Sequence, residues 1–314
     1  MMVLVSVVIP LYNKKNYIGR AVRSVLMQTI EDFEIIIIDD GSLDGSGDVA
    51  KTFLDSRIRH FRQENQGVSA ARNNGVRNAR ADFIAFLDAD DEWLPDHLKT
   101  LLRLRNEYSF AGAFTTVYTI LQPNGKMRSA RYRAIPANPR EGLIPNYFKS
   151  ATLGDSPLNS SSVGIPKIIF NEFGGFPENA WWGEDIDLFG RIALKYPIAF
   201  CWVGGVIYHW DATGRVCGRP SLKPEPFVIT AQRVLSTEQL TESVRKDLKE
   251  YSARKELYRA ASHLYVGNKT KARNILKETH TDYFKSRKYL LFIISKLPGS
   301  IIRLILGPYF FSQP

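Results

Sequence analysis

The sequence has 314 residues, of which 44% are hydrophobic and 24% are charged. These proportions are those of a folded protein and exclude a disordered chain, and the length suffices for one large α/β domain with an appendage. The two cysteines, Cys201 and Cys217, have no CxxC spacing and no neighbouring histidine cluster, which excludes a disulfide framework and a zinc site. We therefore expect a protein of a reducing compartment.

The net charge of +10 is concentrated near the C-terminus. Residues 245–303 contain fifteen Lys and Arg residues against five Asp and Glu residues, which leaves 27 of each kind in the rest of the chain. This distribution argues against nucleic acid as the partner. It predicts that the basic surface and the chemistry occupy different parts of the molecule.

The N-terminal residues are apolar but lack the basic region and the cleavage site of a signal peptide. The β-branched run at residues 3–9, closed by Pro10, predicts a strand buried on both faces of a parallel sheet. Residues 16–28 have helical spacing of apolar positions, and residues 33–38 form a second buried strand. Together they predict a βαβ unit.

The same alternation continues along the chain. It predicts helices at residues 46–55, 68–79, 96–108 and 185–195, and strands at residues 58–61, 83–87, 111–121, 198–203 and 206–208. From residue 237 the composition changes, and two helical stretches are expected at residues 237–266 and 270–279. We expect an α/β fold with a mostly parallel central sheet flanked by helices (residues 1–226), followed by a basic helical C-terminal extension (residues 227–314).

The end of the chain, residues 289–311, is apolar but interrupted. A membrane-spanning helix needs about 20 consecutive apolar residues, so the pattern favours two short interfacial helices. Basic residues flank these stretches, and this combination predicts binding to an anionic membrane surface at the cytoplasmic leaflet. The alternative is a tail that packs on the catalytic domain or on a second subunit. The flanking and interrupting basic residues are Lys285, Arg287, Lys288, Lys296 and Arg303.

Two acidic clusters follow predicted strands. Asp39 and Asp40 end the second strand, and Asp88, Asp90 and Asp91 end the strand at residues 83–87. Because the carboxyl ends of parallel strands meet at one edge of a sheet, we expect a crevice there that suits a nucleotide and its metal. Divalent ions such as Mn²⁺ or Mg²⁺ prefer such oxygen ligands. The alternative is turn chemistry and helix capping.

Four blocks in order resemble family 2 glycosyltransferases. They are residues 5–44, residues 67–93 with an Asp-x-Asp motif, GGFPE at residues 174–178 and GEDIDL at residues 183–188, and they cover roughly the first two-thirds of the chain. The resemblance implies a GT-A fold and a nucleotide-diphosphate sugar donor, usually a UDP sugar. It also implies a glycan or lipid-linked acceptor in cell-surface polysaccharide synthesis.

The resemblance implies roles for residues that follow the first strands. Asp88 and Asp90 would hold ribose and the metal, Mn²⁺ or Mg²⁺, which neutralises the diphosphate. His209 would be a third metal ligand or a diphosphate contact. Independently of the resemblance, the crevice at the strand ends puts Asp40 and Asp44 where they would hydrogen-bond a base or ribose. The alternatives are a core aromatic for Tyr12, a structural ion-pair partner for Arg72 and a packed histidine for His209. The residues expected around the nucleoside are Pro10, Tyr12, Asp40 and Arg72.

The GEDIDL block implies the catalytic base. Asp185 matches the family's base position, Glu184 is the competing candidate, and the alternative for both is charge that complements a helix N-terminus. One carboxylate opposite the leaving group implies a single displacement with inversion at the anomeric carbon.

Aromatic and basic residues near this block complete the predicted site. Trp181 and Trp182 are predicted to stack on an acceptor sugar or to pack in the core. Arg215 and Arg219 are predicted to close over the diphosphate or to lie in a solvated loop.

Rival function classes lack their motifs. The first strand is followed by Pro-Leu-Tyr-Asn-Lys rather than Gly-x-Gly-x-x-Gly, which disfavours a dinucleotide-dependent oxidoreductase, and no P-loop motif occurs. A nucleotidyltransferase of similar fold and a non-catalytic sugar-nucleotide or glycan binder stay open. We expect a metal-dependent inverting hexosyltransferase in the cytoplasm, peripheral on the inner face of the membrane.

Overall fold

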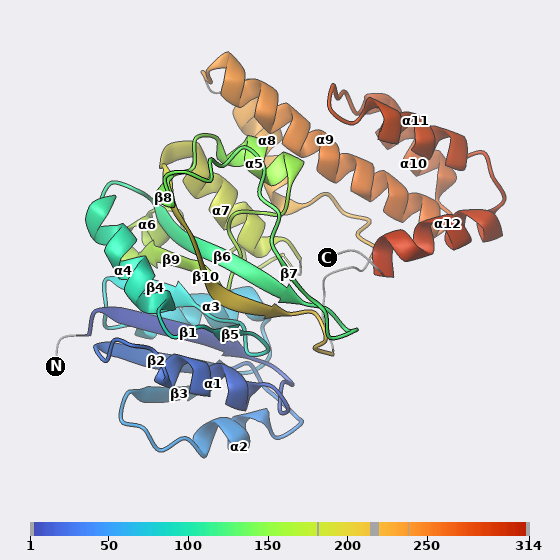
Figure 1. The fold of residues 1–314 in the computed structure, drawn as a ribbon. Helices are drawn as coiled ribbons and strands as arrows, with labels where there is room; N and C mark the ends of the chain where they lie inside the picture. Colours follow the sequence, from blue (N-terminus) through green and yellow to red (C-terminus); the bar gives the residue numbers. More distant parts are fainter. Residues whose placement is uncertain (1–2, 181, 214–219, 238, 312–314) are drawn as a thin grey trace.

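One mixed sheet runs through the N-terminal two-thirds of the chain (Figure 1). The computed structural model describes residues 3–180, 182–213, 220–237 and 239–311. Within these residues the sheet has the order β3-β2-β1-β4-β9-β6-β10-β5, with β7 beside β6 and β8 beside β10. The strands are β1 (Val5–Leu11), β2 (Phe33–Asp39), β3 (Ile58–Arg62), β4 (Phe83–Phe86), β5 (Glu92–Trp93), β6 (Ala113–Leu121), β7 (Met127–Ser129), β8 (Glu141–Leu143), β9 (Val163–Pro166) and β10 (Ile198–His209).

The long ladders of the sheet are parallel. Strands β1, β2, β3 and β4 pair in parallel, and so do β6 and β10. The antiparallel pairs are the shorter ones, formed by β5, β7, β8 and β9. The predicted mostly parallel sheet flanked by helices is therefore confirmed, and short antiparallel strands widen its second half.

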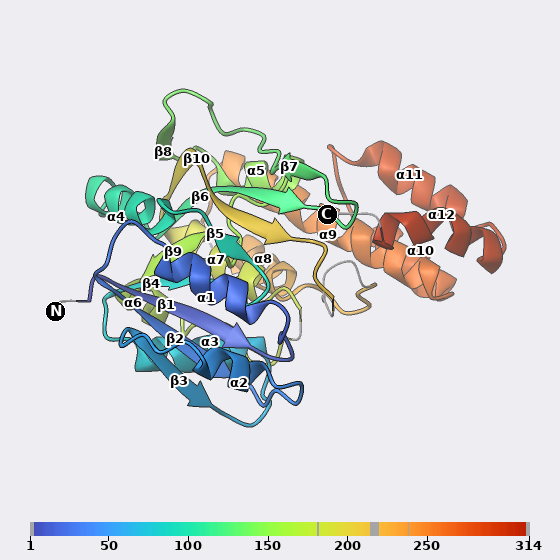
Figure 2. The same ribbon diagram turned by 60° about the horizontal axis from the view of Figure 1, so that its bottom comes forward.

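Helices cover both faces of the sheet, as Figure 2 shows from a second direction. The helices of the described residues are α1 (Ile18–Leu26), α2 (Ser46–Lys51), α3 (Val68–Asn78), α4 (His97–Glu107), α5 (Tyr147–Leu153), α6 (Lys167–Glu172), α7 (Glu184–Lys195), α8 (Pro226–Thr237), α9 (Glu242–Tyr265), α10 (Lys269–Glu278), α11 (Lys285–Ile294) and α12 (Gly299–Phe311).

Strand β1 lies between two cores because successive side chains of a strand point to opposite faces. Val7 and Ile9 pack with Ile18 of α1, whereas Val8 packs with Val76 of α3. All seven residues of β1, and all seven of β2, are buried. A continuous apolar run is therefore what this position requires, and the strands predicted from such runs are confirmed.

The structure corrects several sequence-based boundaries. Helices α5, α6 and α8 were not predicted, because short apolar runs do not distinguish a strand from a buried helix. The strands predicted at residues 198–203 and 206–208 are one strand, β10, whose register shifts around Gly204 break the alternation. Gly205 is required there, since a Cβ would lie 2.3 Å from Nδ1 of His97.

The C-terminal helices form a separate layer. Figure 1 shows α10, α11 and α12, coloured orange to red, gathered at the end of the molecule away from α2 and β3. Their core contains Leu257, Ile275, Ile294 and Ile302. Phe227 of α8, by contrast, belongs to the core beneath the sheet, so the division at residue 226 stays a prediction. Among the described residues, no helix is long and apolar enough to cross a membrane.

The packing of α3 on β1 can be tested at Gly75. A Cβ at this position would lie 2.3 Å from Cγ1 of Val8. Gly75→Ala therefore forces the helix off the sheet, and we expect the free energy of unfolding to fall by about 1–3 kcal/mol despite the higher helix propensity of alanine. Urea denaturation followed by circular dichroism measures the change.

Gly19→Ala in α1 is the matched control. The nearest atoms to a Cβ there belong to the flexible end of Arg23, at 3.4 Å. We expect this variant to be at least as stable as the parent protein. Equal stability of the two variants would contradict the packing inferred for α3.

Candidate active site

A cavity of about 1020 Å³ lies where β1, β2 and β4 end. Residues from all four sequence blocks line it, from Pro10 in the first block to Ile186 in the last. The cavity is large enough for a nucleotide sugar, since ligand pockets typically measure about 300–1,000 Å³. The predicted site residues on its walls are Pro10, Tyr12, Asp40, Arg72, Asp88, Asp90, Trp182, Glu184 and Asp185.

Arg72 on α3 joins two of these blocks. Its guanidinium donates to Oδ1 of Asp88 at 2.7 Å and to Oε1 of Glu184 at 2.8 Å, and it lies over the ring of Phe176. Arg72 is only 3% exposed. Burial opposes its charge, but the carboxylates of Asp88, Glu184 and Asp185 outweigh burial and raise the pKa of Arg72, so it stays charged.

The start of α7 positions the predicted base. Gly183 precedes the helix with a φ of 74°, a left-handed conformation that favours glycine. Asp185 lies in the first turn, where its Oδ2 accepts a hydrogen bond from the hydroxyl of Ser160 at 3.1 Å. Burial and the charge of Asp185 raise the pKa of Glu184, although Arg72 acts against them. Both carboxylates line the cavity; Glu184 is held in an ion pair with Arg72, whereas Asp185 accepts hydrogen bonds from Ser160 and from the backbone N–H of Ile186.

Asp40 organises the loop before α3. Its carboxylate accepts hydrogen bonds from the backbone N–H groups of Gln66 and Gly67, both at 2.9 Å, and from the side chain of Gln63 at 2.8 Å. Tyr12 is 45% exposed at the cavity wall, so it is not a packed core aromatic.

Asp44 lies outside the cavity lining. Its side chain accepts hydrogen bonds from the backbone N–H groups of Lys15 and Ser46, at 3.0 and 2.9 Å, beside the start of α2. Burial opposes the ionised form, but these hydrogen bonds and that of the Ser46 hydroxyl lower the pKa of Asp44. Asp44 thus fixes a turn, and its predicted role in binding base or ribose stays a prediction.

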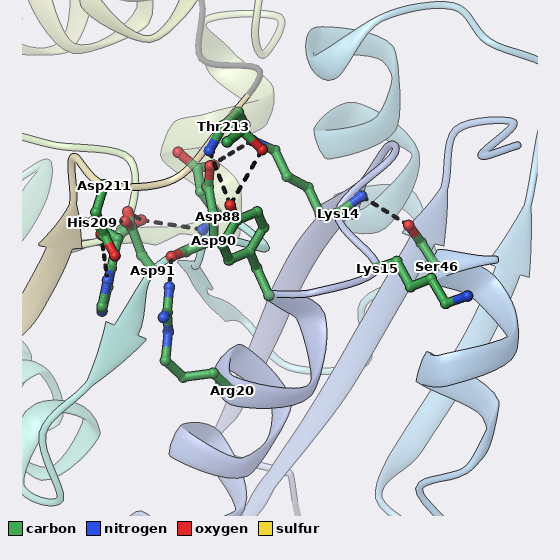
Figure 3. A network of polar contacts seen from close by, with 12 residues as sticks. Lys14, Lys15, Arg20, Ser46, Asp88, Asp90, Asp91, His209, Asp211 and Thr213 are labelled. Atoms are coloured by element: carbon green, nitrogen blue, oxygen red, sulfur yellow. Dashed lines mark hydrogen bonds and ion pairs between the residues drawn. The ribbon is translucent and has the colours of Figure 1, made fainter. Parts of the chain in front are cut away.

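Asp90 is paired with Lys14, a residue that the sequence pattern did not single out (Figure 3). Nζ of Lys14 lies 2.6 Å from Oδ2 of Asp90 and donates to the carbonyl of Thr213 at 2.9 Å. Arg20 donates to the backbone carbonyl of Asp90. The sequence feature that could have identified Lys14 was its position shortly after the first strand, at the end of the sheet where the cavity lies.

Asp88 and Asp90 fit a divalent cation. Each lines the cavity and uses one oxygen in an ion pair, which leaves acceptor capacity on the carboxylate for a metal. Asp91, by contrast, is fully buried and accepts hydrogen bonds from Ser161 and from the backbone N–H of His209. Burial, with the nearby charges of Asp90 and Asp88, raises the pKa of Asp91 well above its usual range.

His209 is not among the residues that line the cavity. Figure 3 shows it beside Asp211. Its Nδ1 is 2.9 Å from Oδ1 of Asp211 and its Nε2 is 3.4 Å from Oε1 of Glu92. Across the described part of the chain, no group of three or more His, Cys, Asp or Glu residues is arranged to hold a metal ion. A third ligand at His209 therefore stays a prediction.

The cavity also includes residues that the sequence placed elsewhere. The ring of Trp182 stacks on Tyr258 of α9, with centroids 6.2 Å apart, and Arg254, Lys255 and Arg287 of the basic C-terminal quarter line the same cavity. The expectation that the basic surface and the chemistry are separate was wrong, because α9 folds back against α5 and α8. Trp181, Arg215 and Arg219 lie outside the described residues.

Residues 6–159 match the sequence profile of "Glycosyl transferase family 2". An uncharacterized glycosyltransferase of Rickettsia conorii, RC0461, is 35% identical over 195 residues, 62% of this chain and 31% of the relative. The putative teichuronic acid biosynthesis glycosyltransferase TuaG of Bacillus subtilis is 40% identical over 125 residues, 39% of this chain and 49% of the relative. The matches thus span half or less of these relatives.

A solved structure has the same fold. The crystal structure of S. aureus TarS 1-349 in complex with UDP-GlcNAc superposes with a TM-score of 0.65 at 17% identity, over 99% of this chain and 92% of that chain.

The ion pairs of Arg72 generate a stability prediction. Arg72→Met leaves the buried carboxylate of Glu184 and the partly exposed carboxylate of Asp88 without their shared cation. We expect the free energy of unfolding to fall by about 3–5 kcal/mol, the usual effect of breaking a buried ion pair. Urea denaturation measures it, with Arg77→Met, an exposed position on the same helix, as the control. A loss no greater than that of the control would refute the central role of Arg72.

Proposed function

Residues 6–159 of the chain form a glycosyl transferase family 2 domain, and from this premise we propose that the protein transfers a sugar from a nucleotide-diphosphate sugar to an acceptor hydroxyl. The observation that carries the proposal is the convergence of Asp40, Asp88, Asp90 and Asp185 on one cavity. In a scattered arrangement these carboxylates would have no common substrate.

The donor proposed is a UDP sugar. The similar fold of TarS, whose structures are described in complex with UDP-GlcNAc and with UDP, supports this choice. The nucleoside would lie against Pro10, Tyr12 and Asp40, and Asp88 and Asp90 would hold Mn²⁺ or Mg²⁺. When bound, such an ion supplies positive charge that stabilises the leaving diphosphate.

The residues of the chain divide the remaining tasks. Asp185 accepts the proton of the attacking hydroxyl, and the hydrogen bond from Ser160 orients its carboxylate. Arg72 holds Glu184 in an ion pair, which leaves Asp185 as the carboxylate proposed to act on the acceptor. Lys14, beside Asp90, adds positive charge at the diphosphate end. A single base opposite the leaving group gives inversion at the anomeric carbon.

The acceptor proposed is a glycan or a lipid-linked glycan of the cell surface. The name of TuaG, a putative teichuronic acid biosynthesis glycosyltransferase, supports a role in polysaccharide synthesis. A cytoplasmic protein peripheral to the membrane suits such an acceptor. The outer sides of α11 and α12 support this location, since Ile293 and Leu304 are 60% and 78% exposed beside basic residues.

The catalytic assignment is tested at Asp90 and Asp185. With UDP-GlcNAc and Mn²⁺, the parent protein should release UDP slowly, and Asp90→Ala should lower that rate by at least about 100-fold because the cation loses a ligand. Asp185→Asn should lower transfer to an acceptor by about 100-fold or more. A coupled assay for UDP measures both rates.

The exposed Asp32→Asn is the matched control and should keep the parent rate. Release of pyrophosphate instead of UDP would point to a nucleotidyltransferase. Equal rates for the parent protein and Asp90→Ala would overturn the metal assignment, and the absence of turnover with any sugar nucleotide would leave a binding protein.

The membrane proposal predicts the behaviour of the exposed apolar residues on the C-terminal helices. The double variant Ile293→Glu, Leu304→Glu should lose most co-sedimentation with phosphatidylglycerol vesicles, because charges oppose insertion of the helix faces. Leu54→Glu changes a 97% exposed residue that is remote in sequence from the C-terminal helices, and this variant should bind as the parent protein does. Undiminished binding by the double variant would reject this surface.

A further inference from the structure

Glu225 and Phe227, where α8 begins, are packed between α7 and α9. On the α7 side, a Cβ at Gly183 would lie 2.9 Å from Cγ of Glu225, and a Cβ at Gly190 would lie 2.4 Å from Cε2 of Phe227. Seven residues, about two helical turns, separate the two glycines, so they lie on the same side of α7. This close approach fixes how α7, whose first turn carries Asp185, sits against the start of α8.

Helix α9 holds Glu225 from the other side. Nζ of Lys255 lies 2.7 Å from Oε2 of Glu225, and the hydroxyl of Tyr251 donates to Oε1 at 3.2 Å. The ring of Tyr251 also meets the ring of Phe227 edge-on, with centroids 5.5 Å apart. Because Tyr251 and Lys255 are four residues apart, one face of α9 makes all of these contacts. Glu225 thus links α9 to Gly183.

Glu225 is buried, with only 2% of the residue exposed, and it is not among the residues that line the cavity. Burial raises the pKa of Glu225, and the charge of Asp185 acts in the same direction. Lys255 and Tyr251 act against both. Replacing a buried ion pair by apolar side chains often leaves stability unchanged or raises it. We therefore explain this buried glutamate by the single arrangement that its partners favour rather than by added stability.

A second contact joins α9 to the same turn. The ring of Trp182, the residue before Gly183, stacks on Tyr258 with an interplanar angle of 21°. Tyr258 is seven residues from Tyr251, about two turns further along the same face of α9. This face therefore contacts the turn before α7 directly at Trp182 and indirectly through Glu225.

We propose that Glu225 is a positioning residue that fixes the turn at Gly183 and thereby the place of Asp185. Lys255 and Tyr251 hold Glu225, so α9 sets the geometry of the predicted base although it follows that base by more than fifty residues. This inference rests on the proposed glycosyl transfer, in which Asp185 accepts a proton. A displacement of a reacting group by about 1 Å can lower a rate by about 100-fold, so a small movement of the turn is enough to slow transfer.

Hydrogen exchange of the full chain tests the positioning without turnover. The backbone N–H of Asp187 donates to the carbonyl of Gly183 at 3.1 Å, in the first turn of α7. Glu225→Ala should speed amide exchange in residues 184–190 by about tenfold or more, because the turn loses its support. Glu225→Gln keeps Cγ against Gly183 and should recover part of the protection. Exchange at the parent rate in Glu225→Ala would overturn the proposal.

Release of UDP from UDP-GlcNAc with Mn²⁺, with water as the acceptor, tests the consequence for the base. Glu225→Ala should lower kcat by about 10- to 100-fold and leave KM within about twofold, because the donor end is unchanged. Lys255 lines the cavity, so a double-mutant cycle separates action through Glu225 from contact with substrate. Adding Lys255→Met to Glu225→Ala should lower kcat no further. Additive losses would overturn the role given to Lys255.

Glu256→Gln is the matched control, since Glu256 pairs with Arg259 on α9 and is not among the residues that line the cavity. It should keep the parent exchange rates and kcat, and thermal melting verifies that each variant is folded. Failure of the parent protein to release UDP would count against the proposed function, while hydrogen exchange would still decide whether Glu225 holds the turn. An active parent protein and an equally active Glu225→Ala would overturn the positioning role alone.

Discussion

The buried guanidinium of Arg72 is the interaction on which the geometry of the cavity depends. It bonds to Asp88, which follows β4, and to Glu184, which is 112 residues further along the chain than Arg72. Without the shared cation, the buried carboxylate of Glu184 would be left uncompensated beside the partly exposed carboxylate of Asp88, which is costly. Arg72 therefore fixes the distance between the acidic cluster after β4 and the start of α7, and with it the separation of the proposed donor and acceptor ends.

Charge is distributed along the cavity in a way that matches these two ends. Around Asp88 and Asp90, the cations Lys14 and Arg72 balance the aspartates, so a metal-bound diphosphate can enter without a large excess of either sign. On the far wall, Lys255 is paired with Glu225, and Arg254 donates to three backbone carbonyl oxygens. The cations at the two ends of the cavity therefore have different partners.

The two ends of the cavity also differ in whether they belong to the segment that matches the family profile. Residues 6–159, which match the family profile, contain the sheet edge, Asp40, Arg72, Asp88 and Asp90. The predicted base, Asp185, comes later in the chain, on α7. The basic residues that line the cavity, Arg254, Lys255 and Arg287, lie on α9 and α11. Since loops and appended helices vary more readily than a buried parallel sheet, an acceptor site built from them can change while the donor site is kept.

The sequence by itself determined the βαβ order, the buried strands and the aspartates at strand ends, because these depend on local periodicity and on the rule that parallel strands end at one edge. Only the tertiary structure decided that Lys14 pairs with Asp90, that His209 turns to Asp211, and that α9 folds back over the cavity. These contacts join residues through side-chain direction and helix packing. Neither side-chain direction nor helix packing produces a periodic pattern in the sequence. The basic composition of the C-terminal quarter could therefore be read from the sequence, but its position beside the cavity could not.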